Sequence, residues 1–110
     1  MVSTVSPSGQ RQRSGPRSVD SEEVFEALAR DGCRAVMRAV GDETLTAAEI
    51  GDRVDAPMSS IYRHLDSLAS IGLLTESIRV DPHGRNQRQY SLAVSELAVS
   101  LGGDFTVQLR

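Results

Sequence analysis

The chain has 110 residues, a formal net charge of −3 and one cysteine, Cys33. Its length predicts a single domain with a small core. Its net negative charge argues against a protein that covers nucleic acids without regard to sequence. Its single cysteine excludes an internal disulfide. All 12 basic side chains are arginine, whose guanidinium group is a permanently charged planar fork that suits phosphates. An acidic protein can still bind a polyanion where its arginines gather on one face.

The N-terminal residues lack the apolar run of a secretory signal, and no stretch approaches the roughly 18 apolar residues that span a bilayer. A free cysteine is typical of a reducing compartment. We therefore expect a soluble cytoplasmic protein that makes no contact with a membrane.

Composition and periodicity divide the chain into three parts. Residues 1–19 are rich in Ser, Gly, Pro, Gln and Arg and hold few large apolar side chains, so we expect a disordered basic arm. Residues 20–92 carry the periodic apolar patterns of a folded domain, and residues 93–110 form a separate alternating segment.

Apolar residues at helical spacing predict two helices, over 21–30 and 32–40, at the start of the domain. Asp20 and Glu23 can cap the first helix, and Asp31 can cap the second.

A turn at 41–43 and a very short strand at 44–45 lead to a third helix, expected over 46–54. Thr46 and Glu49 have the spacing of a capping box, in which each side chain bonds to the backbone N–H of the other residue. This signature predicts where the third helix begins.

A fourth helix is expected over 57–71, because Pro57 suits a first helical turn and Gly72 can end a helix. The apolar period then changes to two. Strands are predicted over 74–80 and 88–92, and they enclose a polar, turn-prone loop.

Residues 97–101 and 105–109 alternate between apolar and polar side chains on either side of Gly102-Gly103. This pattern predicts a further hairpin with a two-residue turn and one apolar face. An isolated hairpin is not stable in water, so that face must cover either the chain's own helices or a second copy of the chain. Both alternatives remain open.

Two short helices joined by a tight turn and followed by a hairpin with a polar, arginine-bearing tip are typical of a winged helix-turn-helix. The predicted fold class is therefore mainly α with a small β component: four short helices, a β-hairpin wing and an additional C-terminal β-hairpin. Ile50 and Val54 of the third helix are expected to pack on Ile61 and Leu65 of the fourth. The opposite face of the fourth helix then stays free, and an α-helix fits the major groove of B-DNA.

That free face carries hydroxyls, an aromatic ring and an arginine, which can contact phosphates or base edges. The predicted DNA contacts on the fourth helix are Ser59, Ser60, Tyr62, Arg63 and Ser67. The remaining predicted contacts are Thr46, at the start of the third helix, and the wing residues Arg79, Arg85 and Arg88. Wing arginines are expected to contact the backbone or the minor groove and to add affinity more than sequence choice.

Three stretches resemble the ArsR-type winged-helix regulators: L-T-A-A-E-I at 45–50, S-S-I-Y-R-H-L at 59–65 and L-A-S-I-G-L-L at 68–74. A fourth, at 28–37, is similar to the segment upstream of the motif in that family. The resemblance covers roughly residues 22–92. It implies a DNA-binding regulator in which the fourth helix faces DNA through Ser59, Ser60, Tyr62 and Arg63.

Metal-sensing members of that family carry a Cys-x-Cys pair, which this chain lacks. We interpret Cys33 as a small core residue, and His64 as a packing or phosphate-contacting residue. No metal or cofactor is therefore expected, and the sequence does not resolve a small-molecule effector. The chain also lacks the phosphate-binding and nucleophile–base motifs that would predict an enzyme.

The sequence favours a sequence-specific regulator of transcription that binds double-stranded DNA, with repression as the simplest outcome. A homodimer is expected, with Phe25 and Phe105 near its interface, because one recognition helix reads only a few base pairs.

The alternative is a winged-helix module that binds another protein, which the net negative charge and Asp66 favour. The arm could contact the minor groove or could be a tail with incidental arginines, and both readings stay open.

Overall fold

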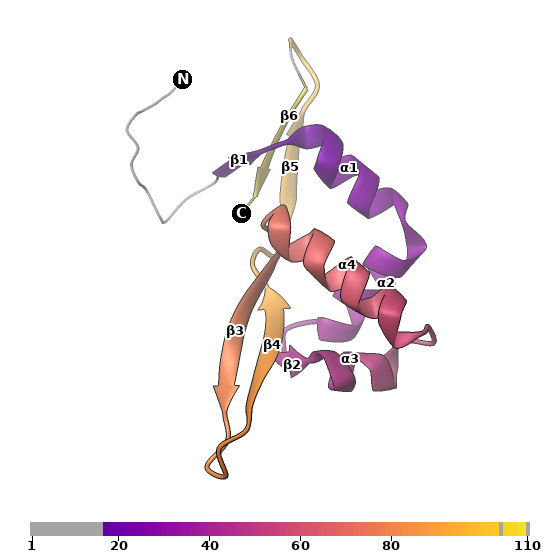
Figure 1. Ribbon diagram of the computed structural model, residues 1–110. Coiled ribbons are helices and arrows are strands. Elements are labelled where there is room, and N and C mark those ends of the chain that lie inside the picture. Colours follow the sequence, from indigo (N-terminus) through magenta and orange to yellow (C-terminus); the bar gives the residue numbers. More distant parts are fainter. Residues whose placement is uncertain (1–16, 104, 110) are drawn as a thin grey trace.

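Four helices pack beside two three-stranded antiparallel sheets in the computed structural model, which describes residues 17–103 and 105–109 (Figure 1). The helices are α1 (Ser21–Ala29), α2 (Asp31–Val40), α3 (Ala47–Arg53) and α4 (Met58–Ser70). The strands are β1 (Arg17–Val19), β2 (Leu45–Thr46), β3 (Leu74–Val80), β4 (Asn86–Leu92), β5 (Leu97–Ser100) and β6 (Thr106–Leu109). The wing sheet has the order β2–β4–β3, and the terminal sheet has the order β1–β6–β5. Their hairpin loops point toward opposite ends of the molecule (Figure 1).

The predicted caps of α1 and α3 are confirmed. A carboxylate oxygen of Asp20 accepts a hydrogen bond of 3.1 Å from the backbone N–H of Glu23. The Thr46 hydroxyl accepts from the N–H of Glu49 at 3.2 Å, and the Glu49 carboxylate accepts from the N–H of Thr46 at 2.8 Å. These bonds satisfy backbone donors that a helix leaves unpaired at its first turn.

The predicted cap of α2 is wrong. Arg30 occupies the cap position without a side-chain bond to the helix, and Asp31 is the first helical residue. The Asp31 carboxylate pairs instead with the Arg34 guanidinium one turn later. An acidic group in the first turn still favours the helix, because it faces the positive end of the helix dipole.

Gly72 ends α4 as expected. Its φ of 87° lies in the left-handed region, which glycine adopts without a steric cost. The N–H of Leu73 bonds to the carbonyl of Leu68 at 2.9 Å, and the N–H of Gly72 bonds to the carbonyl of Ala69 at 3.2 Å. This pair of bonds is a Schellman motif, and it turns the chain directly into β3.

The core is formed by the inward faces of all four helices together with β4 and β6. Its fully covered side chains include Val24, Cys33, Val36, Val40, Ile50, Ile61, Leu65, Leu68, Tyr90, Val107 and Leu109. The interpretation of Cys33 as a core residue is therefore confirmed. No helix in the described part of the chain is long and apolar enough to cross a membrane.

The C-terminal hairpin exists, but its predicted two-residue turn is wrong. Val99 is paired with Val107, and Ser100 with Thr106, so residues 101–105 connect the strands. A turn confined to Gly102-Gly103 would have set Val99 opposite Thr106. The observed register instead pairs Val99 with Val107 and Leu97 with Leu109, so the apolar side chains share the face on which Val107 and Leu109 are buried.

Three strand boundaries also differ from expectation. β4 begins at Asn86 rather than Arg88, and β2 covers Leu45–Thr46 rather than 44–45. Arg17–Val19, predicted as part of the disordered arm, forms β1 and pairs with β6, because the hairpin offers a free strand edge. The fold is thus more evenly mixed than the predicted mainly α class. The rest of the predicted arm, residues 1–16, lies outside the described residues.

Candidate nucleic-acid interface

Helices α3 and α4 pack as a helix-turn-helix pair. Ile50 of α3 and Ile61 and Leu65 of α4 are fully buried between them, as the sequence predicts. At the tight turn, Met58 lies against Gly51, and a Cβ at position 51 would lie 2.5 Å from the Met58 sulfur. Glycine at position 51 therefore leaves room for the Met58 side chain at the turn between α3 and α4.

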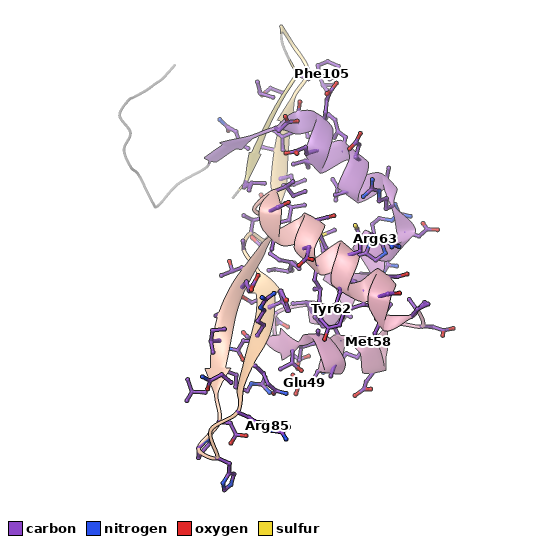
Figure 2. The ribbon with its side chains drawn as sticks, in the orientation of Figure 1. Glu49, Met58, Tyr62, Arg63, Arg85 and Phe105 are labelled. Carbon is purple, nitrogen blue, oxygen red and sulfur yellow. The ribbon has the colours of Figure 1, made fainter. Side chains whose placement is uncertain are left out.

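The outward face of α4 is open to solvent. Ser59, Tyr62 and Arg63 are exposed, and Ser60 and Ser67 are partly buried. Figure 2 shows Met58, Tyr62 and Arg63 along this helix, with Tyr62 on the side of the wing. The Arg63 guanidinium lies 3.5 Å from the Ser60 hydroxyl and has no acidic partner among the residues described. These five residues are thus on the surface that the sequence predicts for DNA contact.

His64 does not belong to that surface, because its side chain packs on α2. Its ring lies against Gly32, where an added Cβ would lie 2.1 Å from the ring Nε2 atom, and its Nδ1 atom lies 3.6 Å from the Cys33 sulfur. Burial lowers the pKa of His64, and the charges of Arg63 and Arg30 lower it further. Burial also raises the pKa of the Cys33 thiol. The pair therefore joins α2 to α4 as neutral groups, which favours the packing role among those considered for His64.

Arg79 is held by the helical domain. Its guanidinium bonds to the Glu49 carboxylate at 3.2 Å, to the Gln89 side chain at 3.0 Å and to the Thr44 carbonyl at 3.4 Å. Glu49 is at the same time the capping residue of α3. The backbone N–H of Thr46 and then Arg79 lower the pKa of Glu49, so the carboxylate stays charged. Arg79 therefore connects the wing to the first turn of α3.

Arg88 is also engaged within the wing sheet. Its Nε atom lies 3.2 Å from the Glu76 carboxylate on the neighbouring strand. A hydrogen bond to Tyr90 and the negative charge of Glu76 raise the pKa of Arg88. A phosphate would have to compete with Glu76 for this guanidinium.

Arg85 differs from the other two wing arginines. It lies at the exposed tip of the β3–β4 hairpin, and its guanidinium has no partner in the described parts of the chain (Figure 2). Asp81 shapes the tip by accepting from the N–H of His83 at 2.9 Å, and Gly84 takes a φ of 90°. The tip is therefore a defined turn that presents the unpaired guanidinium of Arg85 to solvent.

Thr46 is the predicted contact that the structure places least favourably. It is buried, and its hydroxyl is used as the cap of α3. It does border a groove of about 300 Å³ between the helix pair and the wing. The groove is lined by Thr46, Ala47, Ala48, Tyr62, Gln87, Arg88 and Tyr90.

Sequence reasoning missed the acidic partners of the wing and two apolar residues on it. Glu49 and Arg79 are 30 positions apart, so no local spacing pairs them. Ile78 and Val80 are exposed on β3, and the strand pairing places Ile78 opposite Arg88. Alternation along β3 did indicate that two apolar residues share one face, but it did not indicate that the face is uncovered.

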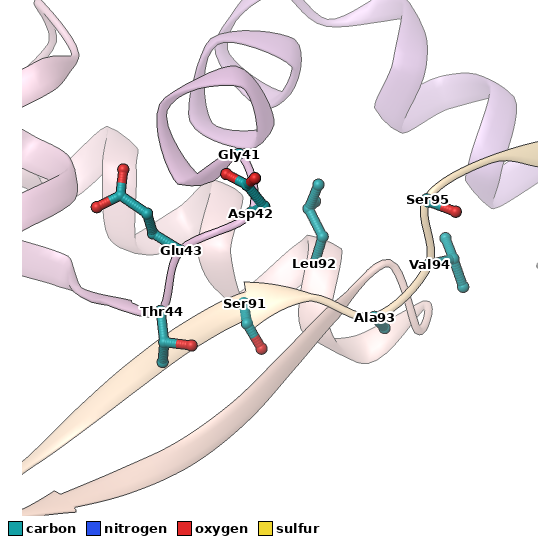
Figure 3. A pocket seen from close by; sticks show the side chains of 9 residues that line it. All are labelled: Gly41, Asp42, Glu43, Thr44, Ser91, Leu92, Ala93, Val94 and Ser95. Carbon is teal, nitrogen blue, oxygen red and sulfur yellow. The ribbon is translucent and has the colours of Figure 1, made fainter.

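A larger hollow of about 450 Å³ lies between the α2–β2 turn and the segment that joins β4 to β5 (Figure 3). It is lined by Gly41, Asp42, Glu43, Thr44, Ser91, Leu92, Ala93, Val94 and Ser95. It contains two carboxylates and no basic side chain, so its charge disfavours a polyanion. In the described residues, no three His, Cys, Asp or Glu side chains come together as a metal site.

Comparison with known families agrees with this geometry. Residues 28–77 match the sequence model of a helix-turn-helix domain, a stretch that runs from the end of α1 to the middle of β3. The match covers somewhat less than half of the chain and supports a helix-turn-helix regulator, without distinguishing the ArsR type. No curated protein matches the chain.

Proposed function

We propose that this protein is a sequence-specific, double-stranded-DNA-binding regulator of transcription, most simply a repressor that occupies its operator. The observation that carries the proposal is the exposed face of α4 beside a wing whose tip presents Arg85. A helix of this kind enters the major groove, while a hairpin beside it reaches the adjacent backbone or minor groove. A cytoplasmic homodimer of the ArsR type belongs to the same proposal.

The roles of the predicted residues can be divided by their partners. Arg63 has no acidic partner in the described structure, and it reads a base or a phosphate from α4. Arg85 contacts phosphate. Arg79 and Arg88 are positioning residues, because their guanidinium groups are already bound to Glu49 and Glu76.

Selection of binding sites from a random DNA pool, followed by titration of the enriched site, tests the proposal. Arg63→Ala should weaken binding to that site by about 1–3 kcal/mol if Arg63 reads a base. Arg38→Ala, which removes an exposed arginine of α2, is the matched control and should bind like the parent. Unchanged affinity of a folded Arg63→Ala protein would remove Arg63 from the interface.

The wing is tested separately through salt. Arg85→Ala should reduce the slope of log affinity against log salt by roughly one unit, because one phosphate contact is lost. Arg88→Ala should change the slope less, since its charge is already compensated by Glu76. An unchanged slope after replacement of all three wing arginines would show that the wing does not contact DNA.

The exposed side chains Ile78 and Val80 favour a second candidate, in which the wing binds another protein. Fold alone does not decide between the two functions. If the pool yields no enriched site and affinity for DNA stays weak in every sequence, the protein-binding alternative replaces the first.

A further inference from the structure

One face of the wing carries two exposed aliphatic side chains on β3. Ile78 is 54% and Val80 is 74% exposed. Side chains alternate along a strand, so both share a face with Leu74, which is buried at the start of β3. Their cross-strand partners on β4 are Arg88 and Asn86. The face is thus covered near Leu74 and uncovered toward the tip, where we call Ile78 and Val80 the aliphatic pair.

This face is turned toward the surface of α4 that is predicted for DNA contact. Arg88 lines one groove together with Tyr62 of α4 and the buried Tyr90. The hydrogen bond to Tyr90 is the main cause that raises the pKa of Arg88, and the negative charge of Asp66 on α4 raises it further. Arg79, between the two residues of the aliphatic pair, is on the opposite face of the sheet. The aliphatic pair therefore lies on the same side of the wing as Tyr62.

The wing extends far enough beyond the helices to reach a second groove of DNA. Tyr90, the last buried residue of the wing on the way to the tip, is paired with Glu76, and Val80 lies four residues further along β3. At about 3.3 Å for each residue, this part of the strand is about 13 Å long. The major groove and the adjacent minor groove are half a turn of the double helix apart, roughly 17 Å. With α4 in the major groove, the end of β3 and the tip therefore lie at the minor groove.

The chemistry of the uncovered face fits that groove better than it fits the phosphates. An aliphatic side chain forms no hydrogen bond with a phosphate, whereas apolar side chains do enter the minor groove in proteins that bind it. Asparagine binds the acceptors of that groove, and Asn86 is exposed opposite Val80. Arg85, at the tip, remains available for the phosphates that border the groove.

We propose that the aliphatic pair enters the minor groove beside the site of α4 and makes the protein prefer A·T base pairs there. In this groove, both orientations of an A·T pair present only acceptors, whereas a G·C pair adds a donor, the N2 amine of guanine. An aliphatic side chain that covers this amine removes its water and offers no acceptor in return. The inference rests on the proposed function and identifies the base pairs that the wing selects.

The surroundings of the aliphatic pair favour DNA over a protein partner. Two side chains are a small part of the roughly 800 Å² that each partner buries in a standard protein interface. Their neighbours on the wing are Arg88 and, at the tip, Arg85, whose charges suit a polyanion. The pair also lies on the side of the wing that α4 shares, so it is continuous with the proposed DNA interface.

Three duplexes that differ only beside the α4 site test the discrimination. The parent chain first selects its site from a random pool. The base pairs about five positions from the centre of the α4 contact, half a turn away, are then set to A·T, G·C or inosine·C. Inosine keeps the major-groove pattern of guanine and lacks its N2 amine. We expect affinity to fall about tenfold with G·C, because a covered donor without a partner is costly, and to recover with inosine·C.

Threonine variants test the two side chains. Ile78→Thr and Val80→Thr keep the branch at Cβ and add a hydroxyl that can accept from the guanine amine. Each should reduce the ratio of the affinities for the A·T and G·C duplexes several-fold. Val99→Thr, the same change at an exposed residue of the terminal sheet, is the matched control and should keep the ratio of the parent. Circular dichroism checks that each variant is folded.

Equal affinity of the parent for the A·T and G·C duplexes, with its selected site still bound, would overturn this inference and leave the proposed function intact. A penalty for G·C that inosine does not relieve, or that survives both threonine variants, would also overturn it. If the parent selects no DNA sequence at all, the proposed function fails and this inference fails with it. The aliphatic pair then belongs to a wing that binds protein.

Discussion

The two sheets of this protein are alike in topology and opposite in chemistry. Each is a hairpin joined by a short strand from earlier in the chain, β2 in the wing sheet and β1 in the terminal sheet. The wing sheet packs on the helices through Leu45, Leu74 and Tyr90, is held further by the ion pair of Arg79 with Glu49, and carries an arginine without a partner at its tip. The terminal sheet is attached by Val107 and Leu109 and leaves apolar residues uncovered. The difference indicates that one hairpin suits a polyanion and the other suits a protein surface.

Ile61→Asp should have the largest effect, because both sheets depend on the same helical core. Ile61 has no exposed surface, and an unpaired carboxylate there costs several kcal/mol, comparable with the whole stability of a small domain. Circular dichroism should show an unfolded chain. Ile78→Asp, an equal change on an exposed residue of the wing, should stay folded. Retained helicity in the Ile61 variant would contradict the assigned core.

Glu49→Gln should loosen the wing sheet and leave the terminal sheet unchanged. The variant keeps the shape of the capping side chain and removes the charge that holds Arg79. Hydrogen exchange of β3 and β4 amides should accelerate, while exchange of β5 and β6 amides should stay as in the parent. DNA affinity should fall several-fold through a misplaced wing.

A double-mutant cycle with Arg79→Ala isolates the pair. If the Glu49–Arg79 contact acts through wing position, the two changes together should cost little more than either alone. Additive losses would show that Arg79 contacts DNA directly. Glu43→Gln, which breaks the exposed pair with Arg53 and leaves the Glu49–Arg79 contact in place, is the control and should alter neither sheet.

The smallest expected effect involves neither sheet. Because burial holds the pKa of His64 below its ordinary value of 6.5, the unfolded chain binds more protons than the folded chain just below that pH. The free energy of unfolding should therefore fall as pH decreases through about 6.5. The lowered pKa values of Glu43 and Glu49 act only below about 4.5, so the two ranges are separate.

Denaturant titrations between pH 5 and 7.5 measure this dependence. His64→Gln should flatten the curve, and His83→Gln, at the exposed wing tip, should leave it unchanged. A parent protein whose stability is constant over this range would contradict the packing of His64 on α2.

Local signals predicted much of the fold. The capping box of Thr46 and Glu49, the glycine that ends α4 and the two-residue period of β3 each involve neighbours within a few positions, and each is present as expected. Signals that compete with distant burial failed. The predicted Gly102-Gly103 turn is not formed, and the observed register matches apolar residues of β5 with the buried Val107 and Leu109 of β6.

The residues of the candidate site show the same contrast between local signals and properties that depend on distant partners. Helical spacing placed Ser59, Tyr62 and Arg63 opposite the buried Ile61 and Leu65, and the structure shows the first three exposed. Residue spacing could not show which of the three wing arginines has an acidic partner and which is free. The sequence describes them as equivalent charges, whereas the structure leaves only Arg85 without a partner among the residues it describes.

By itself, the sequence determined which segments are helices and strands and which face of each is apolar, because periodicity and caps are set by residues one to four positions apart. Only the tertiary structure decided which charges are free and which apolar face stays uncovered. Those properties depend on partners far apart in the chain, such as Glu49 with Arg79 and β1 with β6. Their contact exists only once the core has closed.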